Sequence, residues 1–244
     1  PSDVVEVSLE PEVEEYPVTM MLSRDGYLKK MTDRVLKKAS SLKYKDGDEP
    51  FIEFPSSNTH ELLVFTDHSQ VYKCKVASFE DTKSAQLGSY LPTDLEMDPD
   101  ENVTWVIDPE DYKADVLFVF ENGRVARVAL AGYVTKTNRK RLKNAIYGGS
   151  KLLYAEVLKE EHDLALVSSD YRMVNFNTSL LKTKTTTSTQ GVVVFTAKGS
   201  RTVTNVGKAE DFLGGKASVE KFRAASVPSS GSPLKETDMK SLFD

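Results

Sequence analysis

The chain has 244 residues, 39% of them hydrophobic and 28% charged, and a formal net charge of −5. This composition is typical of a folded protein with a sizeable core, and the length is sufficient for one domain and a tail. The single cysteine, Cys74, excludes an internal disulfide. No apolar run approaches the roughly 18 to 20 residues that a transmembrane helix needs.

Four segments share one pattern, in which an apolar run, a polar turn and a second run ending in a basic or amide side chain follow one another. Their turns lie at Gly26, Ser69, Gly123 and Tyr171, so the spacings are 43, 54 and 48 residues. Each segment reads as a β-hairpin, because apolar and aromatic runs flank a turn rich in Asp, Asn, Ser and Gly. A period of this size predicts a repeat architecture with one supersecondary unit per repeat.

A second feature keeps the same period. About twenty residues after each turn, a glycine precedes a further strand-like run, at Gly47, Gly88, the pair Gly148 and Gly149, and Gly191. Strands at this density indicate an all-β protein with little helix. A propeller-like ring of four-stranded blades fits best, because radial repetition leaves only short, protected sheet edges.

The repeats divide the chain into three parts. Residues 1–15 are an acidic lead-in, residues 16–206 hold the four repeats, and residues 207–244 form a tail. Within the tail, residues 228–233 have the Pro, Ser and Gly composition of a linker. Because the repeats end at Val206, the tail and the N-terminal strand are candidates for a fifth blade.

The charges are segregated along the chain. Residues 1–15 hold six acidic and no basic residues, and residues 94–121 hold ten acidic residues against one lysine, Lys113. Basic residues cluster instead in residues 24–45, 134–151 and 183–208. Basic loops at equivalent places on successive blades would form a positive band, which is the electrostatic feature of a protein that binds a phosphate backbone. The alternative is that the lysines only solvate their loops, but three clusters in step with the repeats favour binding.

The second repeat carries a family resemblance. Residues 62–76, Leu-Leu-Val-Phe-Thr-Asp-His-Ser-Gln-Val-Tyr-Lys-Cys-Lys-Val, resemble the blade motif of the C-terminal domain of bacterial type IIA topoisomerase A subunits, the family that includes the A subunits of DNA gyrase and of topoisomerase IV. In that family the motif reads Leu-Leu-Phe-Thr, a polar pair, Gly, any residue, Val, Tyr, Lys, any residue, Lys, Val. Residues 23–30, 121–127 and 189–194 resemble the same family's blade openings and second-glycine strands, so the resemblance covers residues 16–206.

The resemblance implies a β-pinwheel, a propeller variant whose blades exchange strands and whose basic rim binds and bends duplex DNA without reading its sequence. The implied partners are duplex DNA, the cleavage core and the B subunit of a bacterial, cytoplasmic and nucleoid-associated enzyme, with no membrane contact. ATP and Mg would be used elsewhere in that parent enzyme. Together with the charge clusters, the resemblance names as candidate DNA-binding residues Lys29, Lys30, Arg34, Lys37, Lys38, Lys73, Lys75, Arg124, Arg127, Arg139, Lys140, Arg141, Lys143, Lys151, Lys198 and Arg201.

The chain departs from the family pattern in two places. It lacks the Gln-Arg-Arg-Gly-Gly-Arg-Gly box of the gyrase protein, whose nearest remnants are residues 86–88, 147–151 and 190–191. The topoisomerase IV interpretation is therefore favoured, and strong wrapping of DNA is not expected. In the fourth repeat, Tyr171 occupies the turn-glycine position and Asn175 the basic position, which predicts weak binding by that blade.

Catalytic residues are missing from the pattern. No tyrosine lies in the Arg-Tyr-Thr context of the family's cleaving tyrosine, and residues 210–217 depart from a phosphate-binding loop at Glu210 and Ala217. The three histidines, His60, His68 and His162, lack partners at metal-ligand spacing. We therefore expect a domain that is not an enzyme on its own and has no cofactor or metal.

A second class of function stays open at this point. The alternative is a propeller-like protein-interaction scaffold that docks through the acidic residues 94–121 and does not bind DNA. Within that stretch, Asp98 and Asp100 are more simply part of a solvated loop than a metal site.

Overall fold

Each of the four sequence repeats forms an antiparallel hairpin in the computed structural model, which describes residues 11–215 and 217–240. The hairpins of blades 1 to 4 are β1 (Pro17–Ser23) with β2 (Tyr27–Thr32), β4 (Glu61–Thr66) with β5 (Val71–Lys75), β8 (Asp115–Phe120) with β9 (Arg124–Ala129), and β12 (Asp163–Ser168) with β13 (Arg172–Asn177). The turn residue has a positive φ in every hairpin, 94° at Gly26, 57° at Ser69, 84° at Gly123 and 55° at Tyr171. A positive φ costs a residue with a side chain about 1 to 2 kcal/mol. Ser69 and Tyr171 nevertheless have a positive φ, which confirms that they occupy the same turn position as Gly26 and Gly123.

Two further strands flank each hairpin. Beside the first hairpin strand of blades 1 to 4 lie β3 (Pro50–Ser57), β7 (Val103–Ile107), β11 (Leu152–Leu158) and β15 (Val203–Gly207). Beside the second strand of blades 1 to 3 lie the outer strands β6 (Ser89–Tyr90), β10 (Arg141–Leu142) and β14 (Val192–Val193). Each outer strand comes from beyond the next hairpin in the sequence, so that β6 of blade 1 follows the hairpin of blade 2. The blades thus exchange strands, which confirms the all-β pinwheel.

The hairpins of blades 2 to 4 are buried on both faces because the blades stack on one another and the tail covers the last of them. Along β4, Leu62 and Val64 pack into the core shared with blade 1, whereas Leu63 and Phe65 pack into the core shared with blade 3. The same alternation recurs in β8 and β12. A strand covered on both faces reads as a continuous apolar run, which explains the hydrophobic segments that mark the repeats.

We call the chain that runs from the end of a hairpin to the end of the next outer strand a crossover segment. The three crossover segments span residues 76–90, 130–142 and 178–193, and they begin with the 3₁₀ turns η1 (Val76–Ser78), η2 (Leu130–Tyr133) and η3 (Thr178–Leu180). Two predicted glycines, Gly88 and Gly191, let the outer strands approach the hairpins. A Cβ on Gly191 would lie 2.1 Å from the carbonyl oxygen of Val125.

The tail supplies a fourth crossover segment without a hairpin of its own. Residues 219–233 begin with the 3₁₀ turn η4 (Val219–Phe222) and end in β17 (Ser232–Pro233), which pairs with β13 as β14 pairs with β9. Between them, β16 (Arg223–Ala224) pairs with β13 in parallel. The linker-like residues 228–233 therefore reach the fourth sheet. The described ranges contain four sheets, and the tail completes blade 4 instead of building a fifth blade.

The tail also covers the free face of blade 4. Leu213, Phe222 and Leu234 pack against Ala165 and Val167 of β12. The remaining short helices are α1 (Asp33–Lys38), α2 (Leu91–Asp94), α3 (Ala209–Phe212) and η5 (Glu236–Asp238). Within the described ranges, every helix is too short to cross a lipid bilayer. Residues 1–10 of the acidic lead-in, Lys216 of the loop at residues 210–217, and the last four residues lie outside the described residues.

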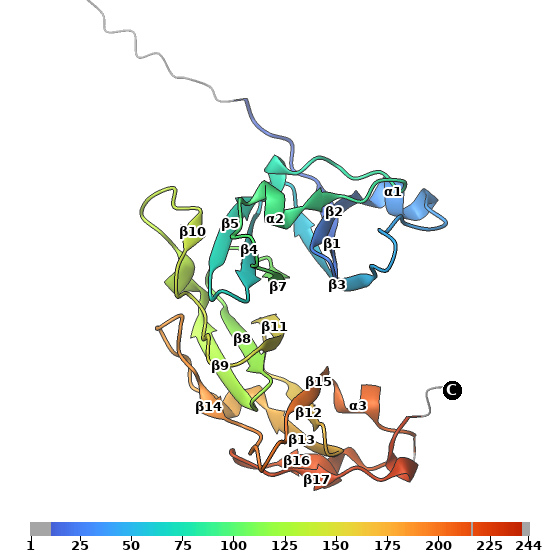
Figure 1. The fold of residues 1–244 in the computed structure, drawn as a ribbon, viewed down its shortest axis with the longest axis vertical. Helices are drawn as coiled ribbons and strands as arrows, with labels where there is room; N and C mark the ends of the chain where they lie inside the picture. The colour runs from blue at the N-terminus through green and yellow to red at the C-terminus, as the bar shows by residue number, and fades with distance from the viewer. Residues whose placement is uncertain (1–10, 216, 241–244) are drawn as a thin grey trace, which may run out of the picture.

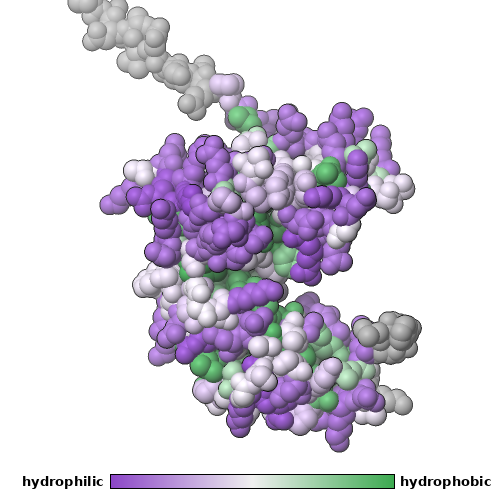
Figure 2. All heavy atoms as spheres, in the orientation of Figure 1, coloured by the Kyte–Doolittle hydropathy of each residue, from purple (hydrophilic) through white to green (hydrophobic). Residues whose placement is uncertain are grey.

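The four blades follow one another along an open arc (Figure 1). β7, β11 and β15 lie on its concave side, whereas β10, β14 and the β16–β17 segment lie on its convex side. On the concave side, Trp105 makes edge-on contacts with Phe51 and Tyr154, with ring centroids 5.2 and 5.5 Å apart. Figure 2 shows a recess where the arc is open and hydrophilic side chains over the convex edge near β10.

Gly191→Ala is expected to lower the free energy of unfolding by about 2 to 4 kcal/mol, because the new methyl group overlaps the Val125 carbonyl in a left-handed backbone. Gly199→Ala is the matched control. Gly199 has a similar φ of +60°, but a Cβ there meets nothing within 4 Å, so we expect a loss of only about 1 kcal/mol. Urea unfolding of both variants measures the difference. If both variants lost the same free energy of unfolding, the close approach of β14 to Val125 would add nothing to the cost of the substitution.

Candidate nucleic-acid interface

Three candidate cations share one place in the repeat, the fourth residue after the hairpin turn. We call this place the latch position, and it holds Lys30, Lys73 and Arg127 in blades 1 to 3. Lys30 is 3% exposed. Its Nζ donates to the carbonyl oxygen of Phe79 at 3.0 Å and lies 3.2 Å from the Asp81 carboxylate, both in the crossover segment that follows the hairpin of blade 2.

Lys73 makes the equivalent contacts one blade further on. Its Nζ donates to the carbonyl oxygen of Tyr133 at 3.0 Å and to Thr135 Oγ1 at 3.3 Å, in the crossover segment that follows the hairpin of blade 3. It also lies 3.4 Å from the carboxylate of Glu61, at the start of β4. The ammonium group is therefore held between its own blade and the next.

Arg127 repeats the arrangement at the junction of blades 3 and 4. Its Nε donates to Asp115 at 2.7 Å and its Nη1 donates to Glu161 at 2.7 Å. The same Nη1 reaches the carbonyl oxygens of Thr178 and Leu181 at 3.4 Å. Burial lowers the pKa of Arg127, but the two carboxylates outweigh it and raise that pKa above its ordinary value. The guanidinium is thus charged and already paired.

Two further candidates hold the exchanged strands. Lys29 is buried, and its Nζ donates to the carbonyl oxygens of Gln86 and Leu87 at 2.6 and 2.8 Å, next to β6. Burial lowers the pKa of Lys29, and the Asp48 carboxylate opposes that shift. Arg124 reaches the carbonyl oxygen of Gly191 at 3.4 Å, next to β14. Both side chains are occupied within the fold.

Arg141 and Arg201 are bound to carboxylates. Arg141, on β10, donates to both oxygens of Asp98 at 2.9 Å, and this bond lowers the pKa of Asp98. Arg201 donates to both oxygens of Asp170 at the hairpin turn of blade 4, and its side chain is 9% exposed. The hydrogen bonds from Arg201 and then Ser168 lower the pKa of Asp170 to about 2.

Nine of the sixteen candidates have exposed side chains: Arg34, Lys37, Lys38, Lys75, Arg139, Lys140, Lys143, Lys151 and Lys198. Arg139 and Lys140 lie in the crossover segment of residues 130–142, and Lys143 directly follows it. α1 carries the first three and follows the hairpin of blade 1, as the crossover segments follow the others. Lys151 and Lys198 lie apart from these, in the loops that lead to β11 and β15.

The crossover segments carry four further exposed lysines, Lys83, Lys136, Lys182 and Lys184, each within five residues of the end of η1, η2 or η3. Lys136 and Lys184 belong to the basic clusters of the sequence, whereas Lys83 and Lys182 lie outside them. Aligning the residues after each hairpin, rather than the hairpins themselves, would have placed them together. The crossover residues 130–142 and 178–193 contain no carboxylate, so their lysines face no opposing charge from their own segment.

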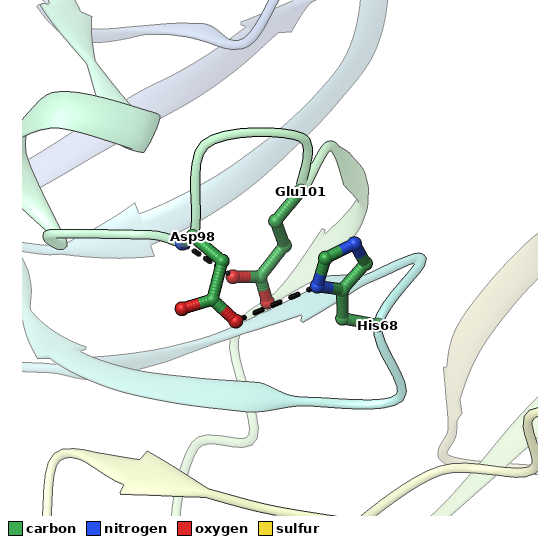
Figure 3. A group of neighbouring side chains, drawn as sticks. All are labelled: His68, Asp98 and Glu101. Atoms are coloured by element: carbon green, nitrogen blue, oxygen red, sulfur yellow. Dashed lines mark hydrogen bonds and ion pairs between the residues drawn. The ribbon is translucent and has the colours of Figure 1, made fainter.

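His68, Asp98 and Glu101 approach one another beside blade 2 (Figure 3). The carboxylate of Glu101 is buried and accepts hydrogen bonds from Thr66, Gln70 and Tyr72 and from the backbone N–H of Asp98. An ionised carboxylate has about four acceptor positions, so those of Glu101 are filled. The cluster is built as a hydrogen-bond network that anchors Arg141 and β10, and it leaves no free ligand atom on Glu101 for a cation.

Sequence comparisons lead to the A subunits of bacterial topoisomerases. The A subunit of DNA topoisomerase 4 from Bacillus subtilis is 26% identical over 142 residues, that of DNA gyrase from Streptomyces coelicolor 27% over 195, and that of DNA topoisomerase 4 from Staphylococcus aureus 22% over 188. The matches cover 57%, 71% and 74% of this chain but 18%, 22% and 23% of the relatives, so the chain spans about a fifth of their length. No family model matches.

Solved structures with the same fold are C-terminal domains of these proteins. The crystal structure of the C-terminal domain of DNA topoisomerase IV has a TM-score of 0.73 at 20% identity and covers 93% of this chain and 76% of its own. The DNA gyrase A C-terminal domain has a TM-score of 0.61 at 16% identity, with 92% and 80% covered. The E. coli ParC C-terminal domain has a TM-score of 0.60 at 17% identity, with 78% of each chain covered. The homologues are thus topoisomerase A subunits, and the fold is that of their C-terminal domains.

The Asp170–Arg201 pair predicts a specific dependence of stability on pH. Because the pKa of Asp170 falls from 3.8 to about 2 on folding, its contribution is present above pH 3.8 and is lost as the pH falls through about 2. Asp170→Asn should therefore be less stable than the parent protein at pH 5, and the difference should shrink between pH 4 and pH 2. Urea unfolding of both proteins across this range measures it. A difference that is constant with pH would contradict the assignment.

Proposed function

We propose that this domain binds duplex DNA along its convex edge and bends it, as the C-terminal domain of a type IIA topoisomerase A subunit. The observation that carries the proposal is the distribution of exposed cations. Three segments that follow hairpins, namely α1 with its loop and the crossover segments 130–142 and 178–193, present exposed lysines and arginines. The two outer strands β10 and β14 run along the convex edge (Figure 1), so their crossover segments supply a track of positive charge.

Such a track suits a phosphate backbone better than a base sequence. Lysine and arginine side chains on loops neutralise phosphates and release counterions, which gives affinity without sequence preference. A protein that binds DNA on a curved edge must bend it, and the additional phosphates that the bend brings to the protein offset the cost of deformation. We infer that the curvature of the arc sets the direction of the bend, so that a bound segment is presented for strand passage.

Blade 4 is proposed to contribute least. Its latch position holds Asn175, and two cations of the tail's crossover segment are already paired. Lys221 lies 2.9 Å from Asp238 and Arg223 lies 2.8 Å from Asp163. Paired cations release fewer counterions when DNA arrives, so we assign the main contacts to α1 of blade 1 and to the crossover segments 130–142 and 178–193, which end in the outer strands of blades 2 and 3.

The assignment to topoisomerase IV rather than gyrase rests on the missing gyrase box, because the sequence relatives include both kinds of protein. In the proposed parent enzyme, the protein partners are the cleavage core and the B subunit, whereas ATP hydrolysis takes place outside this domain. The same proposal places the protein with the nucleoid in the bacterial cytoplasm. The acidic residues 94–121 serve in part within the fold, through Asp98, Glu101 and Asp115, which leaves less of the stretch for docking a protein.

A triple variant, Arg139→Ala with Lys140→Ala and Lys143→Ala, tests the proposed edge. It should weaken duplex binding about equally for all sequences and flatten the plot of log K against log salt by roughly 0.9 for each phosphate that the variant no longer neutralises. A gel-shift titration of linear duplex, supercoiled circles and relaxed circles at several salt concentrations measures both effects.

Lys113→Ala is the control, because Lys113 is exposed but lies outside the segments that carry the edge. We expect binding by this variant to match that of the parent. Unchanged affinity in the triple variant would reject the edge assignment. A parent protein that binds no duplex, together with a partner protein that binds residues 94–121, would favour the scaffold function.

A further inference from the structure

The latch cations resemble phosphate contacts in sequence but are internal ties in the fold. The side chains of Lys30, Lys73 and Arg127 are only 4%, 10% and 17% exposed. Each side chain starts on the second hairpin strand of one blade and ends on backbone carbonyls after the hairpin of the next blade. The tie therefore crosses every junction between blades 1 and 4.

The terminal blade shows that the tie is a feature of the repeat. Asn175 takes the latch position of blade 4, where it is 1% exposed and its Oδ1 has no hydrogen-bond partner. Its register partner on β16 is Arg223, whose guanidinium donates to Asp163 at 2.8 Å. Asp163 starts β12 as Glu61 starts β4 and Asp115 starts β8. In blade 4, Arg223 of the tail thus takes the place of the latch cation. No further blade follows blade 4 within the described residues.

We propose that Lys30, Lys73 and Arg127 are positioning residues, which set the angle between successive blades and thereby the bend imposed on duplex DNA. This proposal rests on the proposed function. A duplex resists bending, so an arc with loose junctions would be straightened by bound DNA instead of bending it. Ties made of charge-assisted hydrogen bonds to carbonyls on the neighbouring blade have both the direction and the strength to hold that angle.

Lys73→Met separates a positioning residue from a phosphate contact. Methionine keeps the apolar stem and removes the donor, so the tie to Tyr133 and Thr135 is lost. We expect an unchanged salt slope, because Nζ does not face the duplex, and a smaller bend, measured by energy transfer between the labelled ends of a short duplex. Lys140→Met is the matched control on the exposed edge. It should reduce the salt slope by about 0.9 and keep the bend.

Lys73→Arg tests rescue, since Arg127 fills the same position in blade 3. It should restore the bend. A salt slope in Lys73→Met that falls as in Lys140→Met, or a bend that equals that of the parent, would overturn the proposal.

The free protein provides a test that does not depend on DNA binding. Spin labels at Ala77→Cys and Ala131→Cys, exposed and equivalent positions in η1 and η2, report the angle between blades 2 and 3. Burial raises the pKa of the Cys74 thiol to about 12, so it resists labelling. The distance distribution should be narrow in the parent and broader or shifted in Lys73→Met, and an unchanged distribution would reject the tie.

If Lys73→Met does not fold, Thr135→Val weakens the same tie with Lys73 in place, and it must shift the distribution for the proposal to stand. A parent protein that binds no duplex, but whose distance distribution changes as expected, would reject the proposed function and leave the tie between blades intact.

Discussion

Burial of the central hairpins on both faces is the constraint on which the structure depends. A blade of this size has too little apolar surface to fold alone. Blades 2 and 3 are covered by the blade before and the blade after, and blade 4 is covered by blade 3 and the tail. Leu62 and Val64 face one neighbour, and Leu63 and Phe65 face the other. Strand exchange adds covalent continuity to that packing, because the outer strand of each blade belongs to the chain that has just built the next one. The cores at the junctions and the crossover segments are therefore parts of one cooperative structure.

The stacking also sorts the cations into two groups. On the second hairpin strands, the candidate cations other than the exposed Lys75 point into junctions between blades, where they are bound to carbonyls and carboxylates, as in Lys30 and Arg127. Those on the crossover segments and on α1 project into solvent, apart from Arg141, which is bound to Asp98. A buried, paired charge is costly to uncover, because the group that it leaves behind is also buried. The first group holds the arc together and the second is free to meet a polyanion.

The tail shows how blade 4 is covered among the described residues. A terminal repeat needs a cap with a polar outer surface, and the tail provides one with parts taken from the repeat itself. It has a 3₁₀ turn with a buried aromatic, Phe222, and an outer strand, β17, that joins blade 4. A cation, Arg223, takes over the pairing at the start of β12. The described residues of the tail hold no further hairpin, and β16 and β17 cover the second strand of blade 4.

The amino-acid sequence by itself determined the hairpins, their period, the all-β class and the topoisomerase resemblance, because apolar runs and turn residues are local signals that survive without the fold. It predicted the runs after Gly88 and Gly191 that form β6 and β14, but it did not show which sheet each of these strands joins, because pairing with a distant hairpin leaves no local pattern. Nor did it separate Lys73 from Lys140, since both were candidates for binding DNA. Only the tertiary structure decided that one is held by Tyr133 and the other is exposed. Lys73 is buried by a segment of the next blade that lies some sixty residues away in the sequence, and no local sequence pattern indicates that contact.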